Sequence, residues 1–546
     1  MVSGKMKSKF IRTRTVSDKI NSAKLGHLGC QYEVAEWYRT GKYSLDVNED
    51  MRQSYIKNIT RSLSDIRPYF SEIELINFKG IKNIKGNLEL HPHLNVFVGV
   101  NGSGKTTIID AIIKASSWIT NGIRTGGNGK HLDLDEINNN PTIKDCFVST
   151  ELTIGEKSKF NIQLFKSKNS LSKIRSDLAE FKILAEMYRY CNEEDCDNFN
   201  LPLFSHYSIS RALEIKKEDC KRDSDEVTFV KKLDGYSEES KNFKSLLEWL
   251  TQYDQMRNHD NKNLTEYISK TAEYNAVKKV FDSLNDELKA HGDIGKPMEL
   301  ELQSLKKIIN KLHAEQKSND DTAVKVVKDA IYQFMDIENI RVEVTKEKFD
   351  ILMEKNNVTI SATELSQGEK ALFSLVSDIS KRLILLNPGR EYDALKGHGV
   401  VTIDEIDLHL HPRWQQDIVI KLTKVFPNIQ FILTTHSPQV LSTVPNYCIK
   451  VLNNDSDGNL HISEPEFSLG SESKMILEDI FLVDSRPEGI EIVQVLNRFK
   501  ELIKQDKWDT DESKELEQKL IEWAGEHDPI IKQLQMDIRL RKRRRG

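Results

Sequence analysis

The chain has 546 residues, enough for two or more domains with a large core, and 30% of them are charged, with a formal net charge of −5. This balance excludes a uniformly basic nucleic-acid coat, so any affinity for nucleic acid must be local. No apolar run approaches the ~18 residues of a membrane span and no signal peptide is visible, so we expect a cytoplasmic protein without membrane contact.

The first 70 residues predict a helical extension. The stretch from Ala23 to Gly41 has small and aromatic residues at helical spacing and predicts one helix, followed by a second from Met51 to Leu63. This pair is similar to a single tetratricopeptide or Sel1-like repeat, which cannot bury its own apolar face. We expect it to pack on the body of the protein or on a partner. A basic arm precedes it, with Lys5, Lys7, Lys9, Arg12 and Arg14.

Strand-like stretches at 71–81 and 88–90 follow Pro68, which ends the helical region. A third stretch, Leu94 to Val98, predicts a buried strand and leads into a glycine-rich loop and an apolar helix. The loop fits the Walker A pattern G-x-x-x-x-G-K-[ST], whose backbone N–H groups and helix N-terminus capture phosphate. The candidate nucleotide-binding residues are Gly99, Asn101, Gly102, Ser103, Gly104, Lys105, Thr106 and Thr107. Lys105 would bridge the β and γ phosphates and Thr106 would ligate Mg²⁺.

The long middle segment carries fewer signals. It contains strand-like stretches at 147–154, 160–165 and 201–211, the last ending in Arg211. Helical patterns dominate 241–332 and are interrupted at 290–297, which reads as the tip of an antiparallel hairpin. An ordinary helical lobe and a short coiled-coil arm both fit this pattern. The six cysteines suggest reduced thiols, with a metal site at Cys191 and Cys196 as the alternative.

A second group of motifs begins with Leu365-Ser366-Gln367-Gly368-Glu369-Lys370, which matches the LSGGQ-type signature and precedes a predicted helix, 371–386. Ser366, Gln367, Gly368 and Glu369 would stand at a helix N-terminus, where N–H groups can contact a γ-phosphate. That phosphate would be held by the opposite subunit. The signature therefore implies a homodimer or a higher homo-oligomer.

The apolar stretch 399–403 ends in Asp404 and Glu405, which is the Walker B pattern. Asp404 would hold Mg²⁺ through its water shell, and Glu405 would orient and deprotonate the attacking water. Asp407 follows in a D-loop and is a further nucleotide-site candidate. His409 and His411 could suggest a metal site, although such histidines also occur in ordinary D-loops.

A last apolar strand ends at His436, within Thr434-Thr435-His436-Ser437-Pro438. A histidine at a strand end some thirty positions past Walker B is expected to sense the γ-phosphate and to act in catalysis with Glu405. Together the four motifs, in this order, predict an ABC-type ATPase that uses ATP and Mg²⁺.

The NFKG phrase after the first strand, DEIDLHLHP and TTHSP resemble the SMC-like ATPases of the OLD and RecF type over roughly residues 71–451. Within that group the chain looks most like the PtuA-type ATPases of the Septu anti-phage system, including those linked to retrons. In this group a basic residue after the first strand can approach the phosphates, so Lys79 is a candidate, against an exposed turn lysine. Gln163 is the nearest candidate for a Q-loop glutamine.

The resemblance implies an α/β fold, an ABC-type head with a helical or short coiled-coil insertion and helical extensions at both ends. We expect a helical extension at 1–70, a first ATPase lobe at 71–240, a hairpin insertion at 241–335, a second lobe at 336–470 and a helical C-terminal segment at 471–546.

The C-terminal segment predicts helices at 488–504 and 515–538. Its apolar Leu520, Ile521 and Trp523 could meet a partner or pack against the ATPase body. A basic tail follows, which is either solvated or in contact with nucleic-acid phosphates: Arg539, Arg541, Lys542, Arg543, Arg544 and Arg545.

We expect that the chain is not itself the nuclease, because the first D-x-D after His436, Asp455 and Asp457, reads as a hairpin turn and no H-N-H constellation is visible. The resemblance instead implies a separate HNH nuclease partner of the PtuB type and, in the retron-linked version, a reverse transcriptase with its RNA-linked single-stranded DNA. The competing hypothesis is a RecF- or SMC-like repair ATPase that binds duplex DNA.

Overall fold

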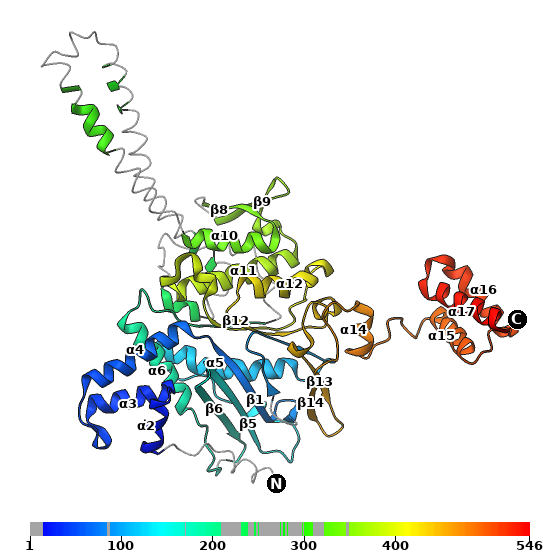
Figure 1. Cartoon of the computed structure of the whole chain (residues 1–546), viewed down its shortest axis with the longest axis horizontal. Coiled ribbons are helices and arrows are strands. Elements are labelled where there is room, and N and C mark those ends of the chain that lie inside the picture. Colours follow the sequence, from blue (N-terminus) through cyan, green and yellow to red (C-terminus); the bar gives the residue numbers. More distant parts are fainter. Residues whose placement is uncertain are drawn as a thin grey trace. The chain divides into compact units, whose positions relative to one another are not determined.

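The computed structural model describes residues 15–84, 88–169, 171–208, 231–237, 322–344 and 349–545, together with short stretches between 245 and 308 (Figure 1). The chain forms two compact units, Met1–Leu469 and Gly470–Gly546. The predicted basic arm at 1–14, Arg211 and most of the predicted hairpin insertion lie outside the described residues.

An 11-stranded sheet forms the centre of the first unit, in the order β6-β5-β1-β2-β14-β13-β4-β12-β11-β7, with β3 paired to β1. One half, β6 to β2, is antiparallel, and the run β13-β4-β12-β11-β7 is parallel. The strands are β1 Pro68–Phe78, β2 Ile81–Ile84, β3 Leu88–Glu89, β4 Leu94–Val98, β5 Asp145–Ile154, β6 Ser158–Ser167, β7 Leu203–Tyr207, β11 Gly399–Ile403, β12 Ile429–Thr434, β13 Ile449–Asn454 and β14 Asn459–Ser463.

Helices cover both faces of the parallel half. Helix α5 (Lys105–Thr125) lies on one face, and α10 (Thr322–Met335), α11 (Gln367–Leu386) and α12 (Pro412–Val425) lie on the other (Figure 1). Every residue of β4, β11 and β12 is buried, as expected for parallel strands enclosed on both faces. This is the predicted α/β fold, and the carboxyl ends of these strands meet at one edge.

Smaller elements complete the first unit. Helix α6 (Ala179–Glu194) packs beside α5 and β6, and the short α13 (Pro438–Leu441) packs against α12. A separate three-stranded antiparallel sheet contains β8 (Glu338–Val344), β9 (Phe349–Lys355) and β10 (Val358–Ser361).

The N-terminal extension differs from the prediction of one helix from Ala23 to Gly41. The chain forms α2 (Val16–Lys24) and α3 (Leu28–Thr40), because Gly26 takes a φ of +100° and the His27 imidazole caps α3 by accepting the Cys30 N–H. Helix α4 (Glu49–Asp65) follows.

The expected docking of this extension on the protein body is confirmed. The Leu28 N–H donates to Ser158 Oγ at 3.0 Å, and Arg52 Nη2 donates to the Tyr190 hydroxyl of α6 at 2.9 Å. The extension therefore belongs to the first unit.

The second unit is helical, with α14 (Ser473–Asp479), α15 (Glu491–Lys504), α16 (Asp511–Trp523) and α17 (Pro529–Arg545). The prediction of one continuous helix over 515–538 is wrong. The first helix ends before Gly525, which has a φ of +47°, and the next begins at Pro529, whose missing N–H suits the first position of a helix. Asp528 Oδ1 caps α17 by accepting the Ile530 N–H at 2.8 Å. The core of this unit is apolar: Leu496, Phe499, Ile503, Leu520, Ile531 and Ile538.

Candidate functional site

The glycine loop between β4 and α5 has the backbone geometry of an anion cradle. Gly102 and Gly104 adopt φ of +80° and +102°, in the left-handed region that favours glycine. At Gly99 a Cβ atom would lie 2.6 Å from the Leu452 carbonyl oxygen, so a side chain there would displace the loop from the neighbouring strand β13. Gly104 caps α5 without a side-chain hydrogen bond, which leaves the first N–H groups of the helix for a ligand.

The Ser103 side chain of this loop is 1% exposed, and its Oγ has no hydrogen-bond partner among the described residues. Lys105 is also buried, and its ammonium donates to the loop carbonyls of Gly99 and Val100 at 2.9 and 3.1 Å. Burial lowers the pKa of Lys105, and the carboxylates of Asp404 and Glu405 partly oppose that shift. The loop therefore contains a buried hydroxyl and, two positions later, a buried cation.

Residues of Walker A and Walker B meet across the sheet. Thr106 Oγ1 donates to Asp404 Oδ2 at 3.0 Å, although 298 positions separate the two residues in the chain. Asp404 follows the last residue of β11, and the parallel pairing of β11 with β12, and of β12 with β4, brings these strand ends to one edge.

Thr434, the last residue of β12, holds both Walker B carboxylate residues. Its hydroxyl donates to Asp404 Oδ1 at 2.5 Å and accepts the backbone N–H of Glu405 at 2.7 Å. Glu405 has a φ of +48°, and its side chain is only partly buried. The residue predicted as base therefore stands in a sharp backbone turn directly after the strand.

The next two residues of the same strand end contact the D-loop. Thr435 Oγ1 donates to Asp407 Oδ1 at 2.6 Å, and the His436 backbone N–H donates to the same oxygen at 3.3 Å. Asp407 and His436, which the sequence places 29 positions apart, are thus neighbours.

The signature segment begins α11. Ser366 caps this helix in a reciprocal capping box, in which its Oγ accepts the Glu369 N–H at 3.4 Å and its own N–H donates to Glu369 Oε2 at 2.9 Å. The Ser366 hydroxyl also donates to Glu369 Oε2, at 2.7 Å. Lys355 of β9 forms an ion pair with Glu369. Burial alone would raise the pKa of Glu369, but the bonds from Lys355 and Ser366 lower it below its ordinary value.

Gly368 of the signature lies directly on the D-loop backbone. A Cβ atom there would stand 2.4 Å from the His409 carbonyl oxygen, so a larger residue would force the signature helix away from the D-loop. Gln367 is the first residue of α11.

The candidate phosphate-contacting lysine, Lys79, and the candidate Q-loop glutamine, Gln163, both bond other parts of the protein. Lys79 has a φ of +50° and forms ion pairs with Asp110 of α5 at 2.5 Å and with Glu136 at 3.8 Å. Gln163 lies within the edge strand β6, and its backbone exchanges two hydrogen bonds with Asp177. Asp455 shapes the predicted hairpin turn by accepting the N–H groups of Asp457 and Asn459.

The sequence motifs alone do not indicate roles for Thr434, Thr435 or Lys355. The signal for the two threonines was the repeated hydroxyl directly before His436 at the end of an apolar strand. Nothing near Lys355 in the sequence indicates its partner, because the pairing depends on the β9–β10 hairpin reaching the start of α11.

These residues fit a magnesium–nucleotide ligand. The loop offers N–H groups, the Lys105 ammonium and the unpartnered Ser103 hydroxyl to phosphate oxygens, and Thr106 and Asp404 offer the hard oxygen ligands that Mg²⁺ prefers. Within the described part of the chain no three His, Cys, Asp or Glu side chains are grouped to hold a metal.

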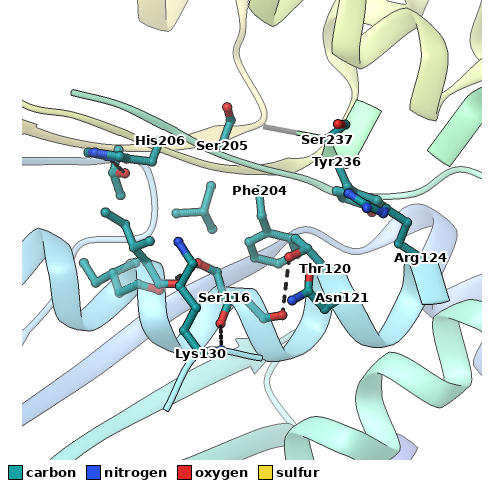
Figure 2. A pocket seen from close by; sticks show the side chains of 15 residues that line it. Ser116, Thr120, Asn121, Arg124, Lys130, Phe204, Ser205, His206, Tyr236 and Ser237 are labelled. Atoms are coloured by element: carbon teal, nitrogen blue, oxygen red, sulfur yellow. Dashed lines mark hydrogen bonds between the residues drawn. The ribbon is translucent and has the colours of Figure 1, made fainter. Parts of the chain in front are cut away.

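A cavity of about 180 Å³ lies between α5 and the strands β7 and β11, with Arg124 at one end and His206 at the other (Figure 2). His206 Nδ1 lies 2.9 Å from Thr402 Oγ1. None of the candidate nucleotide-binding residues lines it, so it is distinct from the phosphate loop. No helix in the described ranges is long and apolar enough to cross a membrane.

Comparisons with known proteins agree with this arrangement. The family model described as "AAA domain, putative AbiEii toxin, Type IV TA system" matches residues 94–442. The chain is 32% identical over 528 residues to the "Retron Vc95 probable ATPase" of Vibrio cholerae serotype O1 biovar El Tor, covering 92% of this chain and 96% of that protein. It is 28% identical over 539 residues to the "Retron Ec83 probable ATPase" of Escherichia coli, covering 96% and 97%.

A shorter match is to the "Septu protein PtuA" of Bacillus mycoides (strain KBAB4), with 40% identity over 101 residues that cover 18% of this chain and 14% of that protein. These relatives confirm the resemblance to the PtuA-type ATPases and their retron-linked version. The chain belongs to the family that this AAA-domain model describes, and it is related over nearly its full length to the probable ATPases of retrons Vc95 and Ec83.

Proposed function

We propose that this protein is the ATP-hydrolysing subunit of an anti-phage defence complex of the retron type, in which it controls a separate HNH nuclease of the PtuB type. The full-length similarity to retron ATPases supports a role in a retron-type defence complex. The hydrogen bond between Thr106 and Asp404 is the observation that supports ATP hydrolysis, because it joins the two halves of the proposed magnesium–nucleotide site.

In the proposed reaction, ATP with Mg²⁺ supplies the phosphoanhydride bond and the neutralising divalent charge. The loop N–H groups, Ser103 and Lys105 hold the phosphates, while Thr106 and Asp404 hold the metal ion. Glu405 orients the attacking water and takes its proton, and His436 contacts the terminal phosphate. Phosphoryl transfer needs this positioning and charge neutralisation more than covalent help from the protein.

The signature residues Ser366, Gln367, Gly368 and Glu369 are proposed to complete the site of a second copy of this chain. They stand at the start of α11, whose N-terminal N–H groups suit a phosphate. The contact of Gly368 with the D-loop backbone would let the signature and Asp407 respond together when two heads meet. The active unit would then be a homodimer or a multiple of it.

The C-terminal unit is proposed to dock the nuclease and to contact nucleic acid. Ile521 and Trp523 of α16 are 40% and 47% exposed, so they are available to a partner, whereas Leu520 belongs to the core of this unit. On α17, Arg541 pairs with Asp537 and Asp506, while Arg539 and Arg543 are exposed. Exposed arginines fit phosphates, including those of a retron reverse transcriptase product, and such binding would weaken with salt.

The ATPase assignment is tested with Glu405→Gln. We expect turnover to fall by about 100-fold or more, because a general base contributes roughly that much, while ATP binding remains and the dimer persists. Steady-state phosphate release and light scattering measure the two effects. The exposed Glu466→Gln is the matched control. Unchanged turnover in Glu405→Gln would remove Glu405 from the role of base.

The partner assignment is tested by tagged purification from the native operon, with mass spectrometry of proteins and sequencing of bound nucleic acid. Recovery of an HNH protein, with or without a reverse transcriptase and its DNA, supports the defence function. Recovery of duplex DNA with repair proteins and no nuclease would favour the RecF- or SMC-like alternative.

A further inference from the structure

We infer that Thr434 is a positioning residue for ATP hydrolysis, holding the metal-site carboxylate and the base in one arrangement through a single hydroxyl group. The inference rests on the proposed ATPase function. It concerns a residue outside the Walker A, Walker B and signature motifs, at the end of the strand that leads to His436.

The hydrogen bonds of Thr434 are directional. A threonine hydroxyl has one hydrogen to donate and lone pairs with which to accept. Here Oγ1–H donates to Asp404 Oδ1 at 2.5 Å, and the same oxygen accepts the Glu405 N–H at 2.7 Å. The side chain is 0% exposed, so water cannot replace either bond.

The first bond determines which oxygen of Asp404 faces the phosphate loop. Oδ1 is taken by Thr434 and Oδ2 receives the Thr106 hydroxyl at 3.0 Å. A carboxylate with one oxygen fixed cannot rotate freely about its terminal bond. Thr434 therefore keeps Oδ2 directed at Thr106, the other residue proposed to hold Mg²⁺.

The second bond fixes the backbone of Glu405. This residue has a φ of +48°, in the left-handed region that a side-chain-bearing residue adopts only where its surroundings hold it. The Ile406 N–H also donates to the Thr434 carbonyl at 3.0 Å, so Thr434 holds the turn through its side chain and its main chain. The direction in which the Glu405 carboxylate points depends on that turn.

Thr435 provides an internal comparison, because it has the same side chain at the next position and different partners. It bonds Asp407 of the D-loop and neither residue of the Walker B pair. Loss of its hydroxyl should therefore affect the D-loop and the His436 backbone, and should not change how the site holds Mg²⁺.

The test compares Thr434→Val, which keeps the shape and removes the hydroxyl, with Thr434→Ser, which keeps the hydroxyl, and with Thr435→Val. For Thr434→Val we expect kcat to fall about 10- to 100-fold, the range for losing a hydrogen bond to a charged group, and the half-saturating Mg²⁺ concentration to rise several-fold. Binding of a fluorescent ATP analogue in EDTA should stay within about twofold of wild type, because Lys105 and the loop are untouched. Thr434→Ser should recover most of the turnover, and Thr435→Val should leave the Mg²⁺ requirement unchanged.

Wild-type turnover in Thr434→Val, or equal impairment in Thr434→Ser, would overturn the inference. Should Thr434→Val fail to fold, the Thr434→Ser variant and its Mg²⁺ titration still decide, since a hydroxyl-dependent role requires near-normal values there. A wild-type protein that binds ATP with Mg²⁺ and hydrolyses none would overturn the proposed ATPase instead. In that case the Mg²⁺ dependence of nucleotide binding still tests Thr434, and an unchanged dependence in Thr434→Val would reject its role.

Discussion

The two units of the molecule both have apolar cores but differ in how much charge they bury. The first unit buries charge: Asp378, Lys381 and Arg382 of α11 are all buried, and Arg382 Nε donates to Asp378 Oδ2 at 2.7 Å. The second unit buries an apolar cluster and leaves ion pairs such as Arg498–Glu512 about half exposed. Buried charges are costly unless they are paired, whereas exposed pairs contribute little.

The buried charges lie in the unit that carries the candidate nucleotide site, and the second unit is stabilised mainly by its apolar core. Burial alone would raise the pKa of Asp378, but Arg382 and Lys381 lower it below the ordinary value, so the carboxylate remains charged inside the fold. The Tyr207 hydroxyl donates to Asp378 Oδ2 at 2.8 Å, and the Asp404 N–H donates to the Tyr207 carbonyl at 2.9 Å, so this network is linked to the strand end that carries Asp404. In the second unit the buried carboxylate is Asp528, which pairs with Arg486 at 2.7 Å at the start of α17. We expect substitutions in the apolar core of this unit to change its folding and to leave ATP hydrolysis unaffected.

The largest expected effect is that of Lys105→Ala on nucleotide binding. Lys105 is the buried cation of the phosphate loop, and its loss leaves the phosphate charge uncompensated in a poorly hydrated site. We expect ATP affinity to fall by about 100-fold or more, which corresponds to roughly 3 kcal/mol. Titration with a fluorescent ATP analogue measures it.

The matched control is Arg124→Ala, an exposed cation in the last turn of the same helix. Its affinity for ATP should equal that of the wild type. Equal losses in both variants would mean that the net charge of α5, and not the loop cradle, determines affinity.

The next largest expected effect is on the free energy of unfolding of the second unit alone. Leu520 is fully buried in the C-terminal core, and Leu520→Ala should destabilise that unit by about 2–5 kcal/mol through lost burial and a residual cavity. Hydrogen exchange of the amides of α15 to α17 in the full chain measures the change directly. Ile521→Ala, at a 40% exposed neighbour, should cost about 0.5 kcal/mol or less.

ATP turnover should remain at the wild-type level in both variants. A loss of turnover in Leu520→Ala alone would show that folding of the second unit is coupled to the hydrolytic site, and the comparison between the units would then fail.

The sequence predicted the fold class and the order of the strands around the nucleotide motifs, because local periodicity and glycine spacing are properties of neighbouring residues. It predicted one helix across Gly26 and another across Pro529, because helical spacing of apolar residues continues through both breaks. Both breaks depend on local caps, His27 and Asp528, which periodicity does not detect.

The sequence was sufficient to predict the residues of each motif in the site, but not the hydrogen bonds that join one motif to another. Asp404, Glu405 and Asp407 could be read from one short stretch, and Lys105 and Thr106 from another. That Thr434 links the Walker B residues depends on β11 and β12 being parallel neighbours in one register, with Ile403 opposite Leu433. Register across hundreds of positions is set by the packed sheet and is not visible in a single sequence.

The smallest expected effect tests whether the buried ionisable groups of the first unit make it sensitive to acid. His398 precedes β11, and burial lowers its pKa from 6.5 to about 4, with Arg390 and Arg67 adding to the shift. As pH falls from about 6.5 towards 4, the unfolded chain binds a proton at this histidine that the folded chain does not bind, so stability present above pH 6.5 is lost.

We expect protonation of this histidine to lower the free energy of unfolding of the first unit by about 1–2 kcal/mol between pH 7 and pH 5. This loss is smaller than the one expected from the cavity at Leu520. In His398→Gln that part of the loss should disappear, so the thermal midpoint of the first unit should fall less on acidification than it does in the wild type. If His398→Gln and the wild type lose stability equally, the acid sensitivity lies in other buried groups, and His398 contributes only packing at the amino end of β11.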